Sequence, residues 1–106
     1  MSEFVTYQEI CRRRNQVCKL RCLASACENE AELHAVLAEV SERVEQQGYE
    51  RFSLVFHAAD DAAPRQGMYA VAMPGATAQE WFLVPIGRTS KGGIAYEACF
   101  NRLAIG

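Results

Sequence analysis

This chain of 106 residues lacks three features that would point directly to a class of function. It has no apolar run near the length of about 20 residues that crosses a bilayer, and its first residues lack the hydrophobic stretch of a secretory signal. Its charge is almost balanced, with 11 basic and 13 acidic residues, so the overall charge does not favour nucleic acid or an anionic membrane. We therefore expect a cytoplasmic protein that binds neither nucleic acid nor membrane.

The spacing of a metal site is also missing, although the chain has five cysteines. Zinc sites usually bring two thiolates together within a short Cys-x-x-Cys segment, whereas six, three and four residues separate Cys11, Cys18, Cys22 and Cys27. The odd number does not fit a closed set of disulfides. We predict that the cysteines pack as small apolar side chains, and that the protein holds no metal and no cofactor.

Side chains for catalysis are scarce. The two histidines, His34 and His57, are not accompanied by a serine in a Gly-x-Ser-x-Gly turn, which is the setting of many serine nucleophiles. Asp60 and Asp61 follow His57 and with it suggest a cation site, but acidic loop residues are usually only hydrated. We predict that the protein is not an enzyme.

Four short apolar runs in the second half of the chain predict β-strands. They are FSLVF, MYAVAM, EWFLVPI and IAYEACF, and turn residues such as Pro-Gly and Gly-Gly separate them. We expect a four-stranded antiparallel meander over residues 52–100. Pro85 cannot donate a hydrogen bond, so its strand should lie at a sheet edge or carry a bulge. The side chains predicted to be buried are Phe52, Leu54, Phe56, Leu83 and Phe100.

The first half of the chain is more ambiguous. From Val17 to Leu23, apolar residues alternate with lysine and arginine, which favours a strand. Thr6 and Glu9 have the spacing of a capping box and predict a short helix. Between residues 30 and 47, apolar residues recur every three or four positions, which is typical of an amphipathic helix.

The order of the apolar runs resembles a family of small bacterial and phage-borne proteins that is known only as a domain of unknown function. The positions that carry the resemblance are Phe52, Ser53 and Leu54; Gln66, Gly67 and Tyr69; Phe82 to Pro85; and Tyr96, Glu97, Ala98, Phe100 and Asn101. The resemblance implies two earlier strands, at NQVCKLR and LHAVLAEV, in place of the helix. It also implies a setting near phage tail or tail-collar-like genes, and no catalytic residue.

Pattern and resemblance together predict one domain, residues 1–106, of the mainly β class. We expect about six antiparallel strands in a small barrel or a two-layer sandwich, with a short N-terminal helical segment. The alternative is an α+β fold with a helix at residues 30–47.

The predicted function is a non-enzymatic interaction or assembly module, associated with a phage tail or a tail-like particle. Its expected partner is another protein or a second copy of the chain. The residues proposed to contact the partner are Arg12, Arg13, Arg14, Trp81, Glu97 and Asn101. The alternative function is a small-ligand-binding β-barrel with Trp81, Tyr69 or Tyr96 at its mouth.

Self-association is predicted from the strands and from the charge pattern. The segments Glu80 to Ile86 and Phe52 to His57 are apolar and would need a partner if they formed exposed edges. Basic residues gather between Arg12 and Arg21, and acidic residues between Glu28 and Glu50. Opposite patches of this kind would attract one copy of the chain to another.

Overall fold

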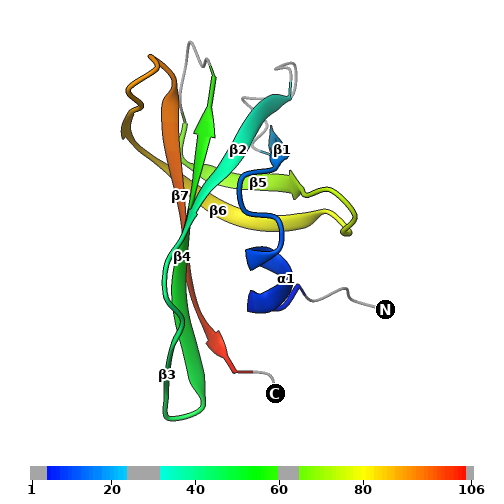
Figure 1. The fold of residues 1–106 in the computed structure, drawn as a ribbon, viewed down its shortest axis with the longest axis vertical. Coiled ribbons are helices and arrows are strands. Elements are labelled where there is room, and N and C mark those ends of the chain that lie inside the picture. The colour runs from blue at the N-terminus through cyan, green and yellow to red at the C-terminus, as the bar shows by residue number, and fades with distance from the viewer. Residues whose placement is uncertain (1–4, 24–31, 60–64, 105–106) are drawn as a thin grey trace.

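Seven strands and one short helix make up the part of the chain that the computed structural model describes, residues 5–23, 32–59 and 65–104 (Figure 1). The elements in chain order are α1 (Tyr7–Cys11), β1 (Val17–Cys22), β2 (Leu33–Val40), β3 (Val44–Gln46), β4 (Tyr49–Ala58), β5 (Gly67–Ala72), β6 (Gln79–Arg88) and β7 (Ile94–Leu103). Neighbouring strands all pair antiparallel.

Six of these strands close into a barrel. Around the barrel the order is β1, β5, β6, β7, β4 and β2, and the pairing of β2 with β1 closes the ring. The seventh strand, β3, pairs with the first residues of β4. The prediction of a small antiparallel barrel of about six strands, with a short helix near the N-terminus, is confirmed.

One predicted pairing is wrong, because the last four strands are not a simple meander. β5, β6 and β7 follow one another, but β4 pairs with β7 and not with β5. β4 and β7 are both ten residues long, and they pair from Tyr49 with Leu103 to Ala58 with Ile94. Because β4 pairs with β7, the edge of β5 that does not face β6 pairs with β1 instead.

The alternative helix at residues 30–47 is wrong over its described part, residues 32–47. β2 forms instead and lies between β1 and β4, with Ala35 and Leu37 buried on its inner face. Val36 lies on the outer face, so apolar residues on both faces of one strand imitate helical spacing. Closing the barrel decides between the two structures, because helix propensity is a weak preference that tertiary pairing overrides.

The interior of the barrel is filled by alternate residues of the strands. Phe52, Leu54, Phe56 and Leu83 are buried as predicted, and Phe100 is partly buried against them. Trp81 packs edge-on against Phe100, with the ring centroids 4.9 Å apart. The other fully buried side chains are Ile10, Cys18, Leu20, Leu37, Val71 and Tyr96.

Barrel closure also changes the expected edges. The segments Glu80–Ile86 and Phe52–His57 were expected to need a partner if they formed exposed edges. In the barrel neither β6 nor β4 is an edge strand, because each pairs with a strand on either side, so this reason to expect a partner strand does not apply. The bulge that Pro85 predicts is confirmed, since the register between β6 and β7 shifts between Pro85 and Gly87.

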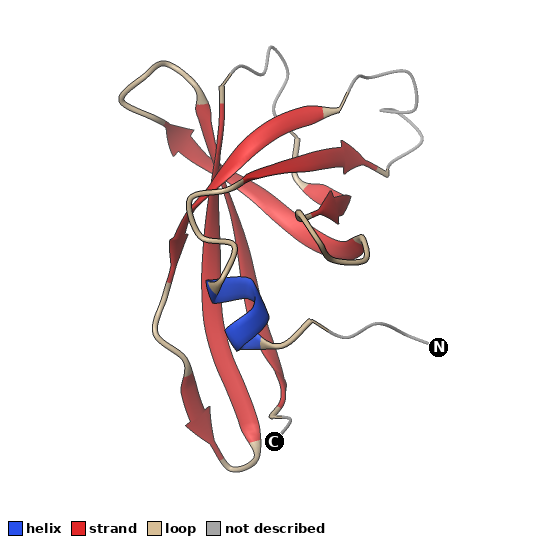
Figure 2. Cartoon of the chain, turned by 45° about the vertical axis from the view of Figure 1, so that its right-hand side comes forward, coloured by secondary structure: helices blue, strands red, loops and turns tan. Residues whose placement is uncertain are grey.

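The helix α1 is a single capped turn that packs against the core through Ile10. Its capping box is confirmed: Thr6 accepts from the backbone N–H of Glu9, and the Glu9 carboxylate accepts from the backbone N–H of Thr6, both at 3.2 Å. Ile10 points into the core and is fully buried. In two views α1 lies beside the lower parts of β4 and β7 (Figures 1 and 2).

Candidate functional site

Three strands continue below the closed barrel and form a tongue, which we define as β3, residues 49–53 of β4 and residues 98–103 of β7 (Figure 1). β2 pairs with β4 only through residues 54–58, and β6 pairs with β7 only through residues 94–97. The pairing of β4 with β7 therefore continues below the barrel without β2 and β6. Within the described residues, β3 and the lower part of β7 each have one unpaired edge.

The tongue begins at a tight hairpin. β3 and β4 are joined by Gln47 and Gly48, whose φ angles are 53° and 82°. Two positive φ values in a two-residue loop are typical of the turns whose twist matches a β-hairpin. The hairpin sets Gln46 opposite Tyr49 and Val44 opposite Arg51.

The inner face of the tongue holds a buried charge. Glu50 is 3% exposed, and its carboxylate accepts hydrogen bonds from Arg43 Nε and from Arg102 Nε, the latter at 2.7 Å. Burial alone would raise the pKa of the Glu50 carboxyl, but the hydrogen bonds from Arg43 and Arg102 hold that pKa below its usual value. The carboxylate is thereby kept ionised inside the protein.

The inner face is also covered by the N-terminal segment. Arg102 donates to the backbone oxygen of Val5 at 3.0 Å, and Tyr7 donates its hydroxyl to the backbone oxygen of Ser41 at 2.6 Å. The ring of Tyr7 packs edge-on against Phe52, with centroids 4.9 Å apart. As far as the described residues show, the inner face of the tongue is therefore occupied, and the outer face is the one exposed to other molecules.

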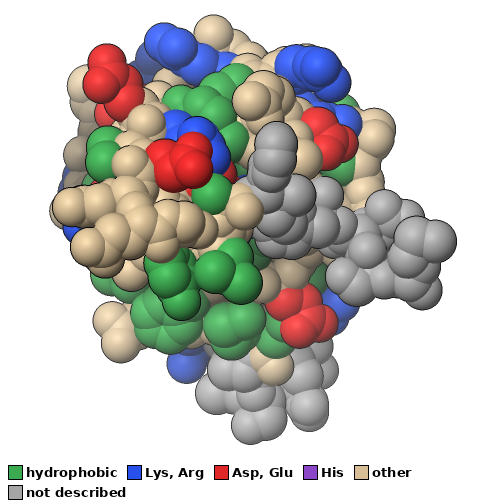
Figure 3. Space-filling view, turned by 90° about the horizontal axis from the view of Figure 1, so that it is seen from below, with side chains coloured by type: hydrophobic (Ala, Val, Ile, Leu, Met, Phe, Trp, Pro, Cys, Tyr) green, Lys and Arg blue, Asp and Glu red, His purple; other side chains and the backbone are tan. Residues whose placement is uncertain are grey.

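The outer face of the tongue carries exposed side chains in rows across the three strands. One row consists of Gln46, Tyr49 and Leu103, and the next consists of Val44, Arg51 and Asn101. Among them, Val44, Tyr49 and Leu103 are 49%, 50% and 63% exposed. Seen from below, hydrophobic side chains gather on one part of this end of the molecule, with acidic and basic side chains around them (Figure 3).

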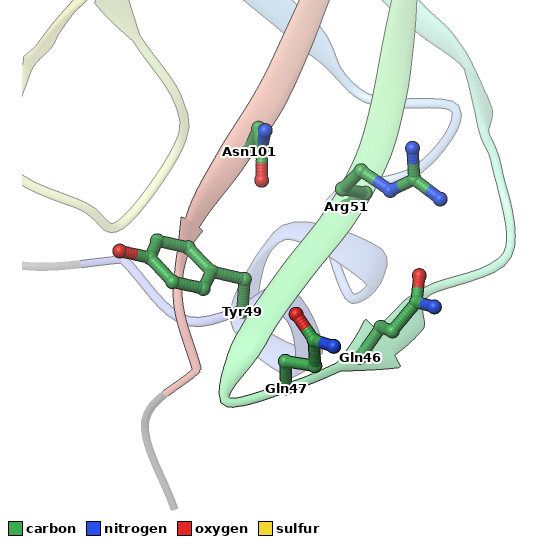
Figure 4. A pocket seen from close by; sticks show the side chains of 5 residues that line it. All are labelled: Gln46, Gln47, Tyr49, Arg51 and Asn101. Atoms are coloured by element: carbon green, nitrogen blue, oxygen red, sulfur yellow. The ribbon is translucent and has the colours of Figure 1, made fainter.

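Two hollows lie on this outer face. The first has a volume of about 280 Å³ and is lined by Gln46, Gln47, Tyr49, Arg51 and Asn101, which come from the hairpin and from β7 (Figure 4). The second, of about 390 Å³, shares Arg51 and Asn101 with the first and extends along the tongue past Cys99. Amide, guanidinium and phenol groups here supply hydrogen-bond donors and acceptors suited to peptide groups.

The structure brings two of the predicted contact residues to one face of β7. Asn101 lies in both hollows, and it is the register partner of Arg51. Glu97 lies further up the same face, opposite Val55 and Val84. Burial, together with the charge and hydrogen bonding of Glu97, raises the pKa of the Cys99 thiol.

The other predicted contact residues are placed elsewhere. Trp81 is buried in the barrel. The Arg13 guanidinium donates to the backbone oxygens of Glu9, Pro74 and Gly75, at 2.6, 2.7 and 3.2 Å, and so fastens α1 to the turn between β5 and β6. The two exposed bases on either side of it, in the turn after α1, are Arg12 and Arg14.

Sequence reasoning missed the tongue residues Tyr49 and Gln46. A weak signal was present in Gly48, because a glycine within a polar segment often marks a turn, although Gln-Gly is not one of the usual hairpin pairs such as Asn-Gly or Asp-Gly. It was hidden because residues 44–46 belong to a segment with helical periodicity.

The potential metal ligands of the described ranges do not lie together. No group of three or more His, Cys, Asp or Glu side chains within them could hold a metal ion. Cys11, Cys18, Cys22 and Cys99 are free thiols, and burial raises the pKa of Cys18 to about 11. The remaining predicted residues, Cys27, Asp60 and Asp61, lie outside the described residues. Among the described elements, no helix is long and apolar enough to span a membrane.

Comparison with known proteins gives a family and no function. No curated protein and no solved structure matches the chain. A family model described as "Domain of unknown function (DUF6916)" matches residues 6–100, a span that includes α1, the whole barrel and most of the tongue. The chain belongs to this family.

Proposed function

We propose that this protein is a non-enzymatic interaction module that binds another protein through the outer face of its tongue. We also propose that it works in the assembly of a phage tail or a tail-like particle, which is the setting that the sequence resemblance implies. The observation that carries the first proposal is the exposure of Val44, Tyr49 and Leu103 in rows that also contain Arg51 and Asn101.

The composition of the outer face supports protein binding. Contiguous exposed apolar side chains with polar neighbours are a mark of interaction surfaces. Tyrosine and arginine are also the side chains that most often dominate binding energy at protein interfaces. Among the described residues, α1 and the N-terminal segment pack on the inner face of the tongue and not on this outer face.

The edges of the tongue offer a second kind of contact. Within the described residues, β3 pairs with β4 on one side only, and residues 98–103 of β7 pair only with β4. An unpaired edge can accept a strand from a partner, with main-chain hydrogen bonds giving affinity and side-chain hollows giving specificity. The two hollows that share Arg51 and Asn101 lie on the same tongue as these edges.

Site-specific photo-crosslinking in the host cell tests the proposal. A photo-reactive amino acid at position 49 should crosslink to one defined protein, whereas the same group at Thr77, exposed in the turn between β5 and β6, should not. A partner that is a structural protein of a phage tail or a tail-like particle would support the second part of the proposal, and any other partner would overturn that part alone.

Matched variants show whether the contact depends on the outer face. The pair Val44→Ser and Leu103→Ser should remove the crosslink from position 49. The pair Met68→Ser and Phe82→Ser is the control, because these two exposed apolar side chains are register partners on β5 and β6, away from the tongue. Equal crosslinking from Thr77, or equal losses in the two variant pairs, would overturn the tongue as the binding surface.

A further inference from the structure

A larger cavity lies on the outside of the barrel at the end away from the tongue, and we call it the upper cavity. Its volume is about 550 Å³, within the range of about 300 to 1,000 Å³ that is usual for small-molecule sites. One wall is the loop Thr89–Gly93 between β6 and β7, and the floor is formed by β2 and the end of β4. Its lining also includes Ala35 and Ala58, which belong to the core cluster, so the cavity adjoins the packed interior of the barrel.

The loop that forms the wall is held closely against β4. A Cβ atom added at Gly93 would lie 1.9 Å from the backbone oxygen of Ala58, so only glycine fits at this position. The hydroxyl of Thr89 accepts from the backbone N–H of Gly93 at 3.0 Å, and the backbone N–H of Thr89 donates to the backbone oxygen of Gly93 at 3.0 Å. The wall is thus fixed by the fold before any ligand arrives, which lowers the entropic cost of binding.

The floor of the upper cavity is apolar. The register places Val17 of β1 opposite Val36 of β2, and Val36 opposite His57 of β4, in one outward-facing row. Ala58 and Ala59 continue the floor under the loop. These side chains offer an apolar surface to the body of a ligand.

The rim of the same cavity carries basic groups and hydrogen-bond donors. Both histidines of the chain, His34 and His57, line it together with Lys91 and the hydroxyl residue Ser90. None of the lining residues in the described part of the chain is acidic. Four described charged residues lie next to the lining in the chain or in the register. Arg88 directly precedes Thr89, and Glu32 lies two residues before His34. Lys19 lies opposite His34, and Glu97 lies two residues beyond the partner of His57 on β7.

We infer that the upper cavity binds a small organic anion, with its carboxylate or phosphate at the basic rim and an apolar body on the floor. A lysine and two imidazoles are donors that suit an anionic group, and the floor explains why the ligand is not a bare inorganic ion. This inference does not depend on the function proposed for the tongue, because the two sites lie at opposite ends of the ladder between β4 and β7.

Titration of the full-length, isotope-labelled protein by NMR tests the inference. The probes are benzoate and phenyl phosphate as anions with an apolar body, benzyl alcohol as the neutral analogue, and inorganic phosphate as the bare anion. Benzoate or phenyl phosphate should shift the amide signals of residues 34–36, 57–59 and 89–93 with a Kd of about 1 mM or below. The tighter of the two identifies the anionic group, and the two control probes should bind at least about tenfold more weakly.

Variants test whether the rim recognises the anion. Lys91→Met and His57→Gln should each weaken binding about tenfold, the usual effect of one charged hydrogen bond. Arg14→Gln is the control, because it removes an exposed base near α1 and should leave the Kd unchanged. An unshifted thermal midpoint checks that each variant is folded. Absence of saturable shifts, equal binding of benzyl alcohol, or an equal loss in Arg14→Gln would overturn the inference.

Discussion

Replacing Glu50 with glutamine removes the one buried charge among the described residues while keeping the size of the side chain. The carboxylate accepts from Arg43 and Arg102, so the change leaves two guanidinium groups facing a neutral amide. Breaking a buried ion pair costs about 3 to 5 kcal/mol, but both arginine side chains reach water, at 27% and 19% exposed. We therefore expect Glu50→Gln to lower the free energy of unfolding by about 2 to 3 kcal/mol at pH 7.

The pH dependence gives a sharper test of the same reasoning. The pKa of the Glu50 carboxyl is lowered in the folded chain, whereas an unfolded glutamate has a pKa of about 4.3. The stabilisation is therefore complete above about pH 5 and is lost as the pH falls through the lower folded-state pKa. Below that pKa, protonated Glu50 resembles glutamine, and the two proteins should have similar stability.

Urea unfolding followed by Trp81 fluorescence, at pH 7 and across the acid range, measures both effects. Glu45→Gln is the matched control, because Glu45 contacts the same Arg43 at 3.1 Å but lies on the surface. Its unfolding midpoint should equal that of the unmodified protein. The reasoning is refuted if Glu50→Gln is as stable as the unmodified protein at pH 7, or if the difference between them stays constant on acidification.

Three further predictions concern the core, the upper loop and self-association. Phe56→Ala should lower the free energy of unfolding by about 3 to 5 kcal/mol in urea, since Phe56 is fully buried; a smaller loss would mean a loosely packed core. Gly93→Ala should cost about 1 to 3 kcal/mol and shift the amide signals at Ala58, because the new methyl group meets that backbone oxygen. The basic segment 12–21 of one copy is expected to attract the acidic segment 28–50 of another, so light scattering should show self-association that weakens as the salt concentration rises. A monomer at every concentration and ionic strength would contradict this prediction.

The alternation of apolar and polar residues predicted the strands well, but it did not indicate that the charged Glu50 is buried. In β4 the inward positions Phe52, Leu54 and Phe56 are apolar and were recognised as core. Glu50 continues the same period of two, yet a glutamate is normally read as exposed. Only the pairing of β4 with β7 brings Arg102 beside it, and no local pattern contains that information.

The same limit applies to the two candidate sites. Asn101 was singled out from the strand pattern, but Gln46, which lines a hollow with it, belongs to a strand that helical spacing concealed. His34 and His57 were weighed separately from Lys91, because nothing in the order of residues shows that the loop after β6 folds over the end of β4. Turn residues predict that a chain reverses, whereas the choice of a distant partner strand depends on closing the whole barrel.

The pairing of β4 with β7 also determines when this protein can fold. β4 ends at residue 58, but the strand that covers its other side begins at residue 94 and ends at residue 103. During synthesis, β4 is therefore complete long before its partner β7 has been made. β6 also pairs with β7, so it lacks this neighbour for the same reason. A chain cut short before β7 would leave both strands with open apolar edges, the state most prone to aggregate. Successful folding of this domain thus depends on a strand that is synthesised well after β4 is complete.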